Sequence, residues 1–296
     1  MRKIVIMGDS TADLNAELRG QYDIDYVQMN YVIDGKEYPA SLDWEYHSAK
    51  EFYDMMRGGK RITTTQVPRN VYTDKFTYWL EQDCDIIYIA CSSALSGSVN
   101  FAKVIAKEMN EKYPAAKIAC IDSLISSLGQ GFMLITAAKM RDEGKTFDEI
   151  VSYIEENKLC VNQCGTVADL KYLKQAGRVT ASSAFFGNLF GVKPIIISDV
   201  KGRNFAIEKV KGYMNAKNRI AEHLVNAVSE EGCDCLYISH ADCIEDAEDL
   251  KECILKRKEF KDVIIGTIGP IVGSCVGPGT IISFCFGEKV TVEGSE

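Results

Sequence analysis

The stretch DIIYIACSSALSGSVNFAKVIAKEMNEKYPAAKIACID, residues 85–122, decides the fold class. It opens with the apolar run Asp85–Cys91 and passes through a Ser/Gly-rich turn into Val99–Tyr113, where apolar residues recur at helical spacing. A second apolar run, Lys117–Ile121, follows. Strand, helix and strand in this order predict a parallel α/β unit, and ligands of such sheets gather at the carboxyl ends of the strands.

The alternation continues on both sides of this stretch. Before it, the pattern predicts a strand over Lys3–Met7, a helix over Leu14–Arg19, a strand over Ile24–Ile33 and a helix over Ser48–Arg57. After it, Asp122–Arg141 is typical of a turn that leads into a helix, and Thr146–Asn157 of an amphipathic helix.

A second unit is expected to begin near Leu159, because 296 residues exceed the usual size of one hydrophobic core. We therefore predict an α/β fold with two α/β domains, residues 1–158 and 159–296. The elements expected in the second are helix Val167–Gln175, strand Pro194–Ser198, helix Ala216–Glu230, strand Cys235–His240, helix Asp246–Lys256, strand Asp262–Gly266, and a strand, loop and strand over Ile268–Phe286 with the loop at Gly273–Gly279.

Composition excludes several classes of protein. The formal net charge of −8 disfavours binding to nucleic acid. Apolar runs are strand-length and fall short of the roughly 20 residues of a membrane-spanning helix. The amino terminus becomes polar too soon for a signal peptide, so we expect a soluble, cytoplasmic protein. The eleven cysteines lack zinc-ligand spacing, which favours free thiols in a reducing compartment over metal ligands or disulfides.

Four hydroxyl-rich loops stand where strands end or helices begin. Helix capping explains any one of them, since Ser, Thr and Asp are preferred N-caps. Four such loops together indicate a site that binds an anion with uncharged donors, namely hydroxyl groups and the amide N–H groups of helix N-termini. The loops are Asp9–Asp13, Thr63–Gln66, Ser92–Ser98 and Asp122–Ser127.

An enzyme remains an alternative. Gly273–Gly277 has the spacing of a hydrolase nucleophile elbow, with Cys275 as nucleophile and His240 as a conceivable base. An elbow requires a helix after the turn, whereas Thr280–Phe286 is typical of a strand. No phosphate-loop or dinucleotide-binding motif occurs, so the sequence predicts no nucleotide use by this chain alone.

The segment Ala184–Val192 places three aromatic residues, including Phe186, among glycines. Tight core packing accounts for this composition, and so does a slot for an acyl chain. Burial of about ten methylenes would give a gross gain of roughly 8 kcal/mol.

Taken in order, these loops resemble the DegV family of bacterial fatty-acid-binding proteins, which includes the binding subunits of fatty acid kinase. The resemblance runs nearly end to end. It is carried by Asp9–Asp13, Thr64–Gln66, Ser92–Ser98, Asp122–Ser123, Asp169–Arg178, Gly191–Pro194 and Gly269–Gly279.

The resemblance implies a ligand tunnel between two α/β domains. It implies that the fatty acid carboxylate meets the hydroxyl loops, and the fatty-acid-binding residues expected from it are Thr64, Ser92, Ser93, Ser96, Gly97, Cys275 and Phe186. Arg178 is expected to contact the kinase or a phosphate, although a surface arginine at a helix end fits the same pattern. No catalytic residue, metal or cofactor is implied.

Two positions depart from the family pattern. Cys275 stands where the family often has His, which replaces a donor that can carry charge by a weak thiol donor. In Thr64–Pro68 the proline lies one position later than in the family's Thr-Ser-Gln-Pro, which alters the restriction on the preceding backbone.

The expected function is to bind a long-chain fatty acid from the membrane pool, by transient membrane contact, and to present its carboxylate to an ATP-dependent kinase subunit that forms acyl phosphate. A lipid sensor or transport protein without a kinase partner, and a Cys275-dependent hydrolase, are the alternatives.

Overall fold

The apolar run at residue 85 forms β6 (Cys84–Ala90), whose seven residues are all buried. It lies inside a four-stranded parallel sheet with the order β2-β1-β6-β7. The other strands are β1 (Lys3–Asp9), β2 (Ile24–Val27) and β7 (Ile118–Asp122). Continuous burial is expected of a parallel strand that is covered on both faces. The carboxyl ends of β1, β6 and β7 therefore meet at one edge of the sheet.

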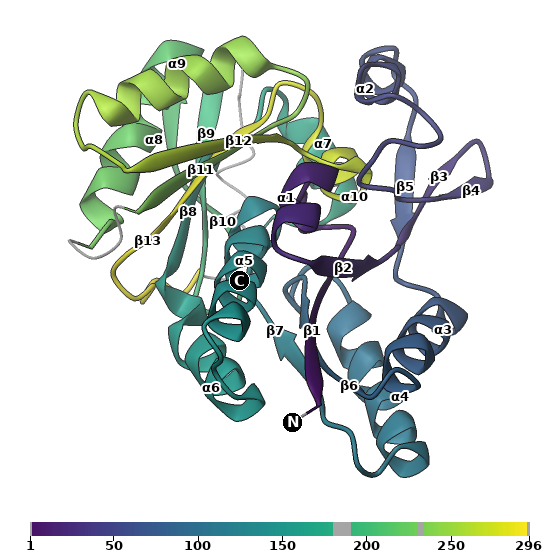
Figure 1. Cartoon of the computed structure of the whole chain (residues 1–296). Coiled ribbons are helices and arrows are strands. Elements are labelled where there is room, and N and C mark those ends of the chain that lie inside the picture. The colour runs from purple at the N-terminus through teal and green to yellow at the C-terminus, as the bar shows by residue number, and fades with distance from the viewer. Residues whose placement is uncertain (1, 180–190, 230–233, 295–296) are drawn as a thin grey trace.

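Figure 1 shows the computed structural model, which describes residues 2–179, 191–229 and 234–294. The helices up to residue 157 are α1 (Ala16–Gln21), α2 (Ala49–Arg57), α3 (Arg69–Leu80), α4 (Ser98–Lys112), α5 (Leu128–Asp142) and α6 (Phe147–Asn157). Helix α5 packs between the two larger sheets, since it contacts β1 and β6 on one side and β8, β11 and β13 on the other. Helices α2 and α6 begin with capping boxes, Ser48 with Glu51 and Thr146 with Glu149.

The single strand expected over Ile24–Ile33 is wrong, because these residues form two strands in two different sheets. After β2, the chain continues as β3 (Asn30–Ile33), which pairs antiparallel with β4 (Lys36–Pro39) and β5 (Ile62–Thr65). Asp34 and Gly35, both with positive φ, form the β3–β4 hairpin turn. Strand-like composition continues across the change of sheet, so local pattern does not reveal it.

The second unit contains a six-stranded sheet with the order β10-β9-β8-β13-β11-β12. Only β11 and β12 pair in parallel. Helices α8 and α9 lie together on one face of this sheet (Figure 1). The elements are the short helix η1 (Lys158–Cys160), β8 (Val161–Thr166), α7 (Leu170–Ala176), β9 (Val192–Ser198), β10 (Asn204–Lys211), α8 (Tyr213–Ala227), β11 (Cys235–His240), α9 (Ile244–Leu255), β12 (Asp262–Thr267), α10 (Pro270–Val276) and β13 (Ile281–Phe286).

The strand expected before Gly273 and the loop expected at Gly273–Gly279 are both wrong over Pro270–Val276, because these residues form helix α10. Gly273 lies inside this helix for a packing reason. A Cβ there would come within 2.4 Å of the hydroxyl oxygen of Tyr53, which donates a hydrogen bond to the carbonyl of Ile268 at 2.7 Å. The glycine permits close approach of α2 rather than a turn.

Helix α3 and strands β4, β5, β8 and β10 are absent from the sequence-based prediction, and the loop expected at Thr63–Gln66 is wrong over Thr63–Thr65, which belong to β5. In α3 the buried residues Tyr72, Phe76 and Leu80 do recur at helical spacing. Its β-branched and aromatic residues are weak helix formers, however, and hide that pattern. Strand β8 has the sequence VNQCGT, which combines polar residues and glycine and resembles a loop.

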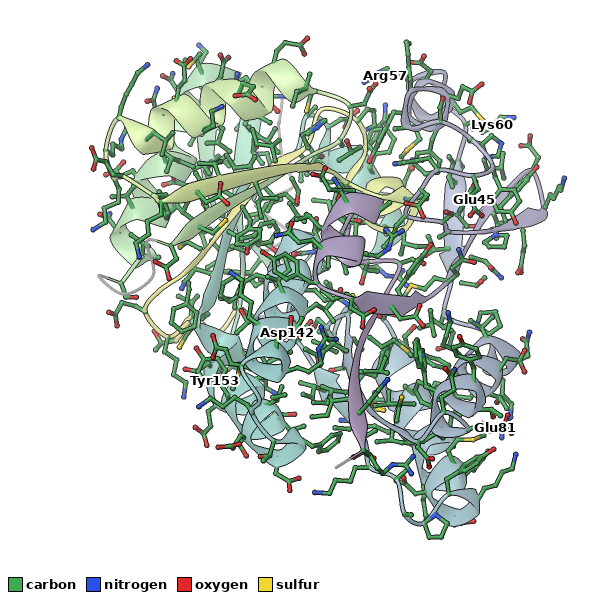
Figure 2. All side chains as sticks on the ribbon, in the orientation of Figure 1. Glu45, Arg57, Lys60, Glu81, Asp142 and Tyr153 are labelled. Atoms are coloured by element: carbon green, nitrogen blue, oxygen red, sulfur yellow. The ribbon has the colours of Figure 1, made fainter. Side chains whose placement is uncertain are left out.

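The α/β fold class is confirmed. Strand β7, which ends at Asp122, belongs to the four-stranded sheet, and β8, which starts at Val161, belongs to the six-stranded sheet. The proposed division at residues 158 and 159 falls in this interval and stays a prediction. Several polar contacts join the two units, among them the 2.6 Å ion pair of Arg57, labelled in Figure 2, with Asp242.

Candidate functional site

A cavity of about 330 Å³ lies where the two units meet. This volume falls in the range of small-molecule sites. The first unit contributes residues that follow β1, β6 and β7, and the second contributes residues of β8, β9, α10 and β13. Of the residues predicted to bind a ligand, the cavity wall contains Thr64, Ser96, Gly97, Cys275 and Arg178.

One end of the cavity is polar and carries little charge. Gly97 is the N-cap of α4, a helix of 15 residues, and as a glycine it has no side chain that could cap the helix. Ser96 instead accepts a hydrogen bond from the Ser98 backbone N–H at 3.3 Å. Thr64 and Gln66 come from β5 and the residues after it. Hydroxyls, an amide and the positive end of a helix dipole together suit a carboxylate or phosphate oxygen.

Asp9 fixes the geometry of this edge of the sheet. The carboxylate is fully buried at the end of β1 and accepts hydrogen bonds from the Thr11 N–H at 3.0 Å and the Cys91 N–H at 3.1 Å. The Tyr88 hydroxyl donates a third at 3.0 Å. Thr11 and Cys91 both line the cavity. Asp9 therefore fixes the loops after β1 and β6 against each other, and these loops form part of the cavity wall.

Ser92 and Ser93 lie outside the cavity wall. The buried Ser92 hydroxyl donates to the Gly202 carbonyl at 2.8 Å and accepts from the Ala94 N–H at 3.2 Å. Ser93 is exposed, and its backbone N–H donates to Asp122 at 3.0 Å. Ser92 therefore joins the loop after β6 to the turn between β9 and β10.

We expect Ser92→Ala to lower the free energy of unfolding by about 1–2 kcal/mol, because the Gly202 carbonyl and the Ala94 N–H would lose a buried partner. Ser93→Ala is the matched control. Its exposed side chain predicts a change within about 0.5 kcal/mol. Urea denaturation of both variants measures the difference, and equal losses would contradict a structural role specific to Ser92.

The remaining wall is largely aliphatic. Side chains from β9, α10 and β13 converge on the cavity, among them Ile196, Ile271, Val272, Val276 and Ile282. Leu173 of α7 joins them. Branched aliphatic residues supply an apolar surface suited to an acyl chain. Phe186 and most of the aromatic-glycine segment lie outside the described residues.

Cys275 lines the cavity from the last turn of α10. Burial raises the pKa of its thiol, so the protonated form dominates near neutral pH. In the described structure, the His240 ring bonds to the Cys243 N–H at 3.3 Å and to Thr267 at 3.5 Å, and no hydrogen bond joins it to Cys275. Cys275 lies inside a helix and not at a turn between strand and helix, which disfavours the hydrolase alternative.

Arg178 follows Gly177, the left-handed residue that ends α7. Its guanidinium is held by carbonyl oxygens, that of Leu95 at 3.4 Å and that of Ala176. Within residues 2–179, 191–229 and 234–294, no carboxylate forms an ion pair with it. The side chain is exposed at the cavity edge, where it is available to an anion.

Several polar residues of the wall escaped the sequence-based prediction. Gln163 donates to Asn204 at 3.1 Å, and Asn204 donates to the Arg178 carbonyl at 3.1 Å. Thr280 donates to the carbonyls of the α10 C-terminus, at 2.9 Å for Gly277. Gln163 and Asn204 belong to the unpredicted strands β8 and β10. Thr11 and Ser126 lie in predicted hydroxyl loops, so parallel strand ends already indicated their position.

Neither a metal centre nor a membrane span appears in the described part of the chain. No group of three or more His, Cys, Asp or Glu side chains there is placed to hold a metal ion. Each helix there is too short or too polar to cross a bilayer.

Fold and cavity together define a class of protein with two α/β units that enclose an apolar site with a neutral polar end. The chain belongs to the DegV family. The family model described as "Uncharacterised protein, DegV family" matches residues 3–287.

Relatives of known sequence or structure extend this similarity over nearly the whole chain. A DegV domain-containing protein of Clostridium perfringens is 36% identical over 288 residues, which cover 97% of this chain and 99% of that protein. The crystal structure of DegV from Bacillus subtilis, described as a fatty acid binding protein, is 27% identical with a TM-score of 0.81 and covers 97% of this chain and 100% of that chain. A DegV lipid binding protein of Thermotoga maritima is 25% identical with a TM-score of 0.85, covering 98% and 100%.

Proposed function

We propose that this protein binds one long-chain fatty acid in the cavity between its units. The supporting observation is the division of one cavity wall into a neutral donor end and an aliphatic part. Gly97 and Thr64 belong to the first part, whereas Ile196 and Ile282 belong to the second. The fatty acid binding stated for the Bacillus subtilis relative agrees with this division.

The energetics favour the acyl chain as the main source of affinity. About ten buried methylenes supply a gross gain of roughly 8 kcal/mol. Ordering of the chain and loss of translational freedom offset part of this gain. The carboxylate contributes mainly orientation, because it exchanges water for hydroxyl and amide donors.

Native mass spectrometry of the purified, delipidated protein tests the proposal. We expect added palmitate to form a one-to-one complex. Absence of bound lipid in the purified protein, together with no uptake of added fatty acid, would contradict it.

We expect Thr64→Val to weaken palmitate binding roughly tenfold, because it removes one hydroxyl donor without changing the volume of the side chain appreciably. Thr63→Val is the matched control, since Thr63 lies in the same strand but outside the wall of this cavity. Isothermal titration calorimetry of both variants gives the comparison. Equal affinities for palmitate would place the carboxylate elsewhere.

The proposed partner is an ATP-dependent fatty acid kinase subunit in the cytoplasm. The bound carboxylate would attack the γ-phosphorus of ATP held by that subunit, and ADP would leave, to give acyl phosphate. Transient membrane contact would supply the fatty acid. The exposed Arg178 beside the polar end supports an encounter with a phosphate group.

A reconstituted assay separates this role from that of a lipid carrier without a kinase. We expect the protein loaded with palmitate to support ATP-dependent acyl phosphate formation when a DegV-dependent kinase subunit is added. Lipid binding without any such stimulation would favour the sensor or transport role.

A further inference from the structure

Three polar side chains form a row across one face of the six-stranded sheet. They are Gln163 of β8, Ser198 of β9 and Asn204 of β10, and these strands are neighbours (Figure 1). Asn204 pairs directly with Ser198. Gln163 comes opposite Ser198, one step beyond the pair of Cys164 with Ile197. Because directly paired residues project from the same face, the three side chains lie side by side. We call them the polar row.

The face that carries the polar row forms part of the cavity wall. Gln163 and Asn204 line the cavity themselves. Two residues further along β8, Gly165 pairs with Ile196 on one side and with Ile282 on the other. All three of these residues also line the cavity. The polar row therefore adjoins the aliphatic surface that would contact an acyl chain.

The polar row lies at a distance from the donor end of the cavity. Helix α10 contacts β5, the strand that contributes Thr64 to that end. The last turn of α10 reaches Thr280, whose hydroxyl donates to the Val276 carbonyl at 3.0 Å. The register of β13 with β8 brings Thr280 to Val167. From Val167 back to Gln163 the chain advances four residues, about 13 Å in extended conformation. Gln163 would therefore face the chain of a bound fatty acid and not its carboxylate.

The polar row leaves hydrogen-bonding groups unpaired. Gln163 Nε2 donates to the Asn204 side-chain oxygen at 3.1 Å, and Asn204 donates to the Arg178 carbonyl at 3.1 Å. In the described part of the chain, the side-chain oxygen of Gln163 accepts no hydrogen bond. Ser198 is 6% exposed, and its hydroxyl has no partner among the described residues either. Buried polar groups without a partner are unfavourable, so this row suits a ligand that supplies one.

A hydroxyl group on the acyl chain has the matching chemistry. A hydroxyl both donates and accepts, so it can donate to the Gln163 oxygen and accept from the Ser198 hydroxyl beside it. A ketone can only accept, and a methylene does neither. The methylenes on both sides of such a hydroxyl would still meet Ile196 and Ile282. An uncharged polar group within an apolar chain is thus the ligand feature that fits this wall.

We propose that the cavity selects long-chain fatty acids that carry a hydroxyl group within the chain, and that Gln163 and Ser198 recognise this hydroxyl. This inference rests on the proposed function and adds the class of fatty acid. In a purely aliphatic cavity an added hydroxyl would weaken binding, because it would give up water without a new partner. Here the plain chain is the poorer ligand, because it leaves the polar row unpaired.

A competition measured by native mass spectrometry tests this preference. The delipidated full chain is offered stearate and 10-hydroxystearate at equal concentration, and in a second run stearate and 12-hydroxystearate. The complexes differ by the mass of one oxygen atom. We expect the hydroxy acid to be preferred about fivefold or more in at least one of the two runs.

Two variants assign the preference to the polar row. In Gln163→Leu, stearate should become the preferred acid and should bind at least as tightly as it binds the wild type. Ser198→Ala should reduce the preference for the hydroxy acid by about twofold or more. Gln82→Leu is the control and should keep the wild-type preference, because Gln82 is exposed and lies outside the cavity wall.

The outcomes separate this inference from the proposed function. Stearate bound as tightly as both hydroxy acids, or more tightly, would overturn the inference and leave the proposed function standing. An undiminished preference in Gln163→Leu would also overturn it, because the hydroxyl would then be recognised elsewhere. If Gln163→Leu bound neither acid, Ser198→Ala would decide, and a full preference in that variant would overturn the inference. Failure of the wild type to bind any of the three acids would overturn the proposed function as well.

Discussion

Gly277→Ala is expected to lower the free energy of unfolding by roughly 2–6 kcal/mol. Gly277 has φ 78° and ψ 167°, a conformation that is nearly exclusive to glycine and costs other residues about 1–3 kcal/mol. A Cβ would also lie 2.1 Å from the ring of Tyr172. That ring is buried, and its hydroxyl donates to the Met56 carbonyl at 3.1 Å, so it has little freedom to move. Overpacking adds about 1–3 kcal/mol.

Gly212→Ala is the matched control for this prediction. Gly212 has a similar backbone conformation, φ 82° and ψ 152°, but a Cβ there meets nothing within 4 Å. It should therefore show the conformational cost alone. Urea denaturation of the two variants measures the difference, and equal losses would mean that the contact with Tyr172 relaxes freely.

Asp13→Asn is expected to remove the loss of stability that Asp13 causes as the pH rises from about 4 to 7. Burial raises the pKa of Asp13 from 3.8 to about 7, although hydrogen bonds from Ser127 and Gly269 oppose the shift. The folded state holds this proton more strongly than the unfolded state, so the contribution of Asp13 to the stability of the wild-type protein falls as pH rises through this window. A shift of about three units corresponds to roughly 4 kcal/mol as an upper value.

Asparagine keeps the shape of the site without the charge. Its carbonyl oxygen can still accept from the Gly269 N–H, now at 2.8 Å, and its amide can donate to Ser127, now 2.5 Å from the carboxylate. The variant should match the wild type near pH 4, exceed it increasingly up to about pH 7 and keep a constant advantage at higher pH. Asp74→Asn, on the exposed side of α3, is the control. Parallel stability curves for Asp13→Asn and the wild type would show that Asp13 does not titrate in this window.

Local pattern predicted those parts of the site that depend on parallel strands. Thr11, Ser96 and Ser126 follow β1, β6 and β7, and strands that run in parallel bring such residues to one edge. Gly97 was expected as a ligand-binding residue from the resemblance to the DegV family, and in the structure a helix starts directly after it.

Long-range contacts decided what sequence pattern missed. Ser92 has a hydroxyl group and lies in a loop where ligand binding was expected. Its hydroxyl instead donates a hydrogen bond to the carbonyl of Gly202, which is 110 residues away in the chain. Gln163 and Asn204 belong to β8 and β10, the two strands that flank β9 in the sheet, and their side chains form a hydrogen bond across it. Their contact therefore depends on the strand order. A second cavity, lined in part by Lys60, Arg61, Lys171 and Arg178, likewise combines Arg61 of the first unit with Lys171 and Arg178, which follow β8 in the chain. None of these neighbours is visible from local sequence.

A crystal structure of the delipidated protein soaked with an ω-bromo long-chain fatty acid would show where the ligand lies and which way it points. We expect the carboxylate oxygens within about 3.2 Å of donors at Thr64 and the Gly97 end of α4. We also expect an anomalous bromine peak at the far, apolar end of the acyl chain, away from these donors. A carboxylate bound outside this cavity, or a chain in the reverse orientation with bromine at Thr64, would contradict this binding mode.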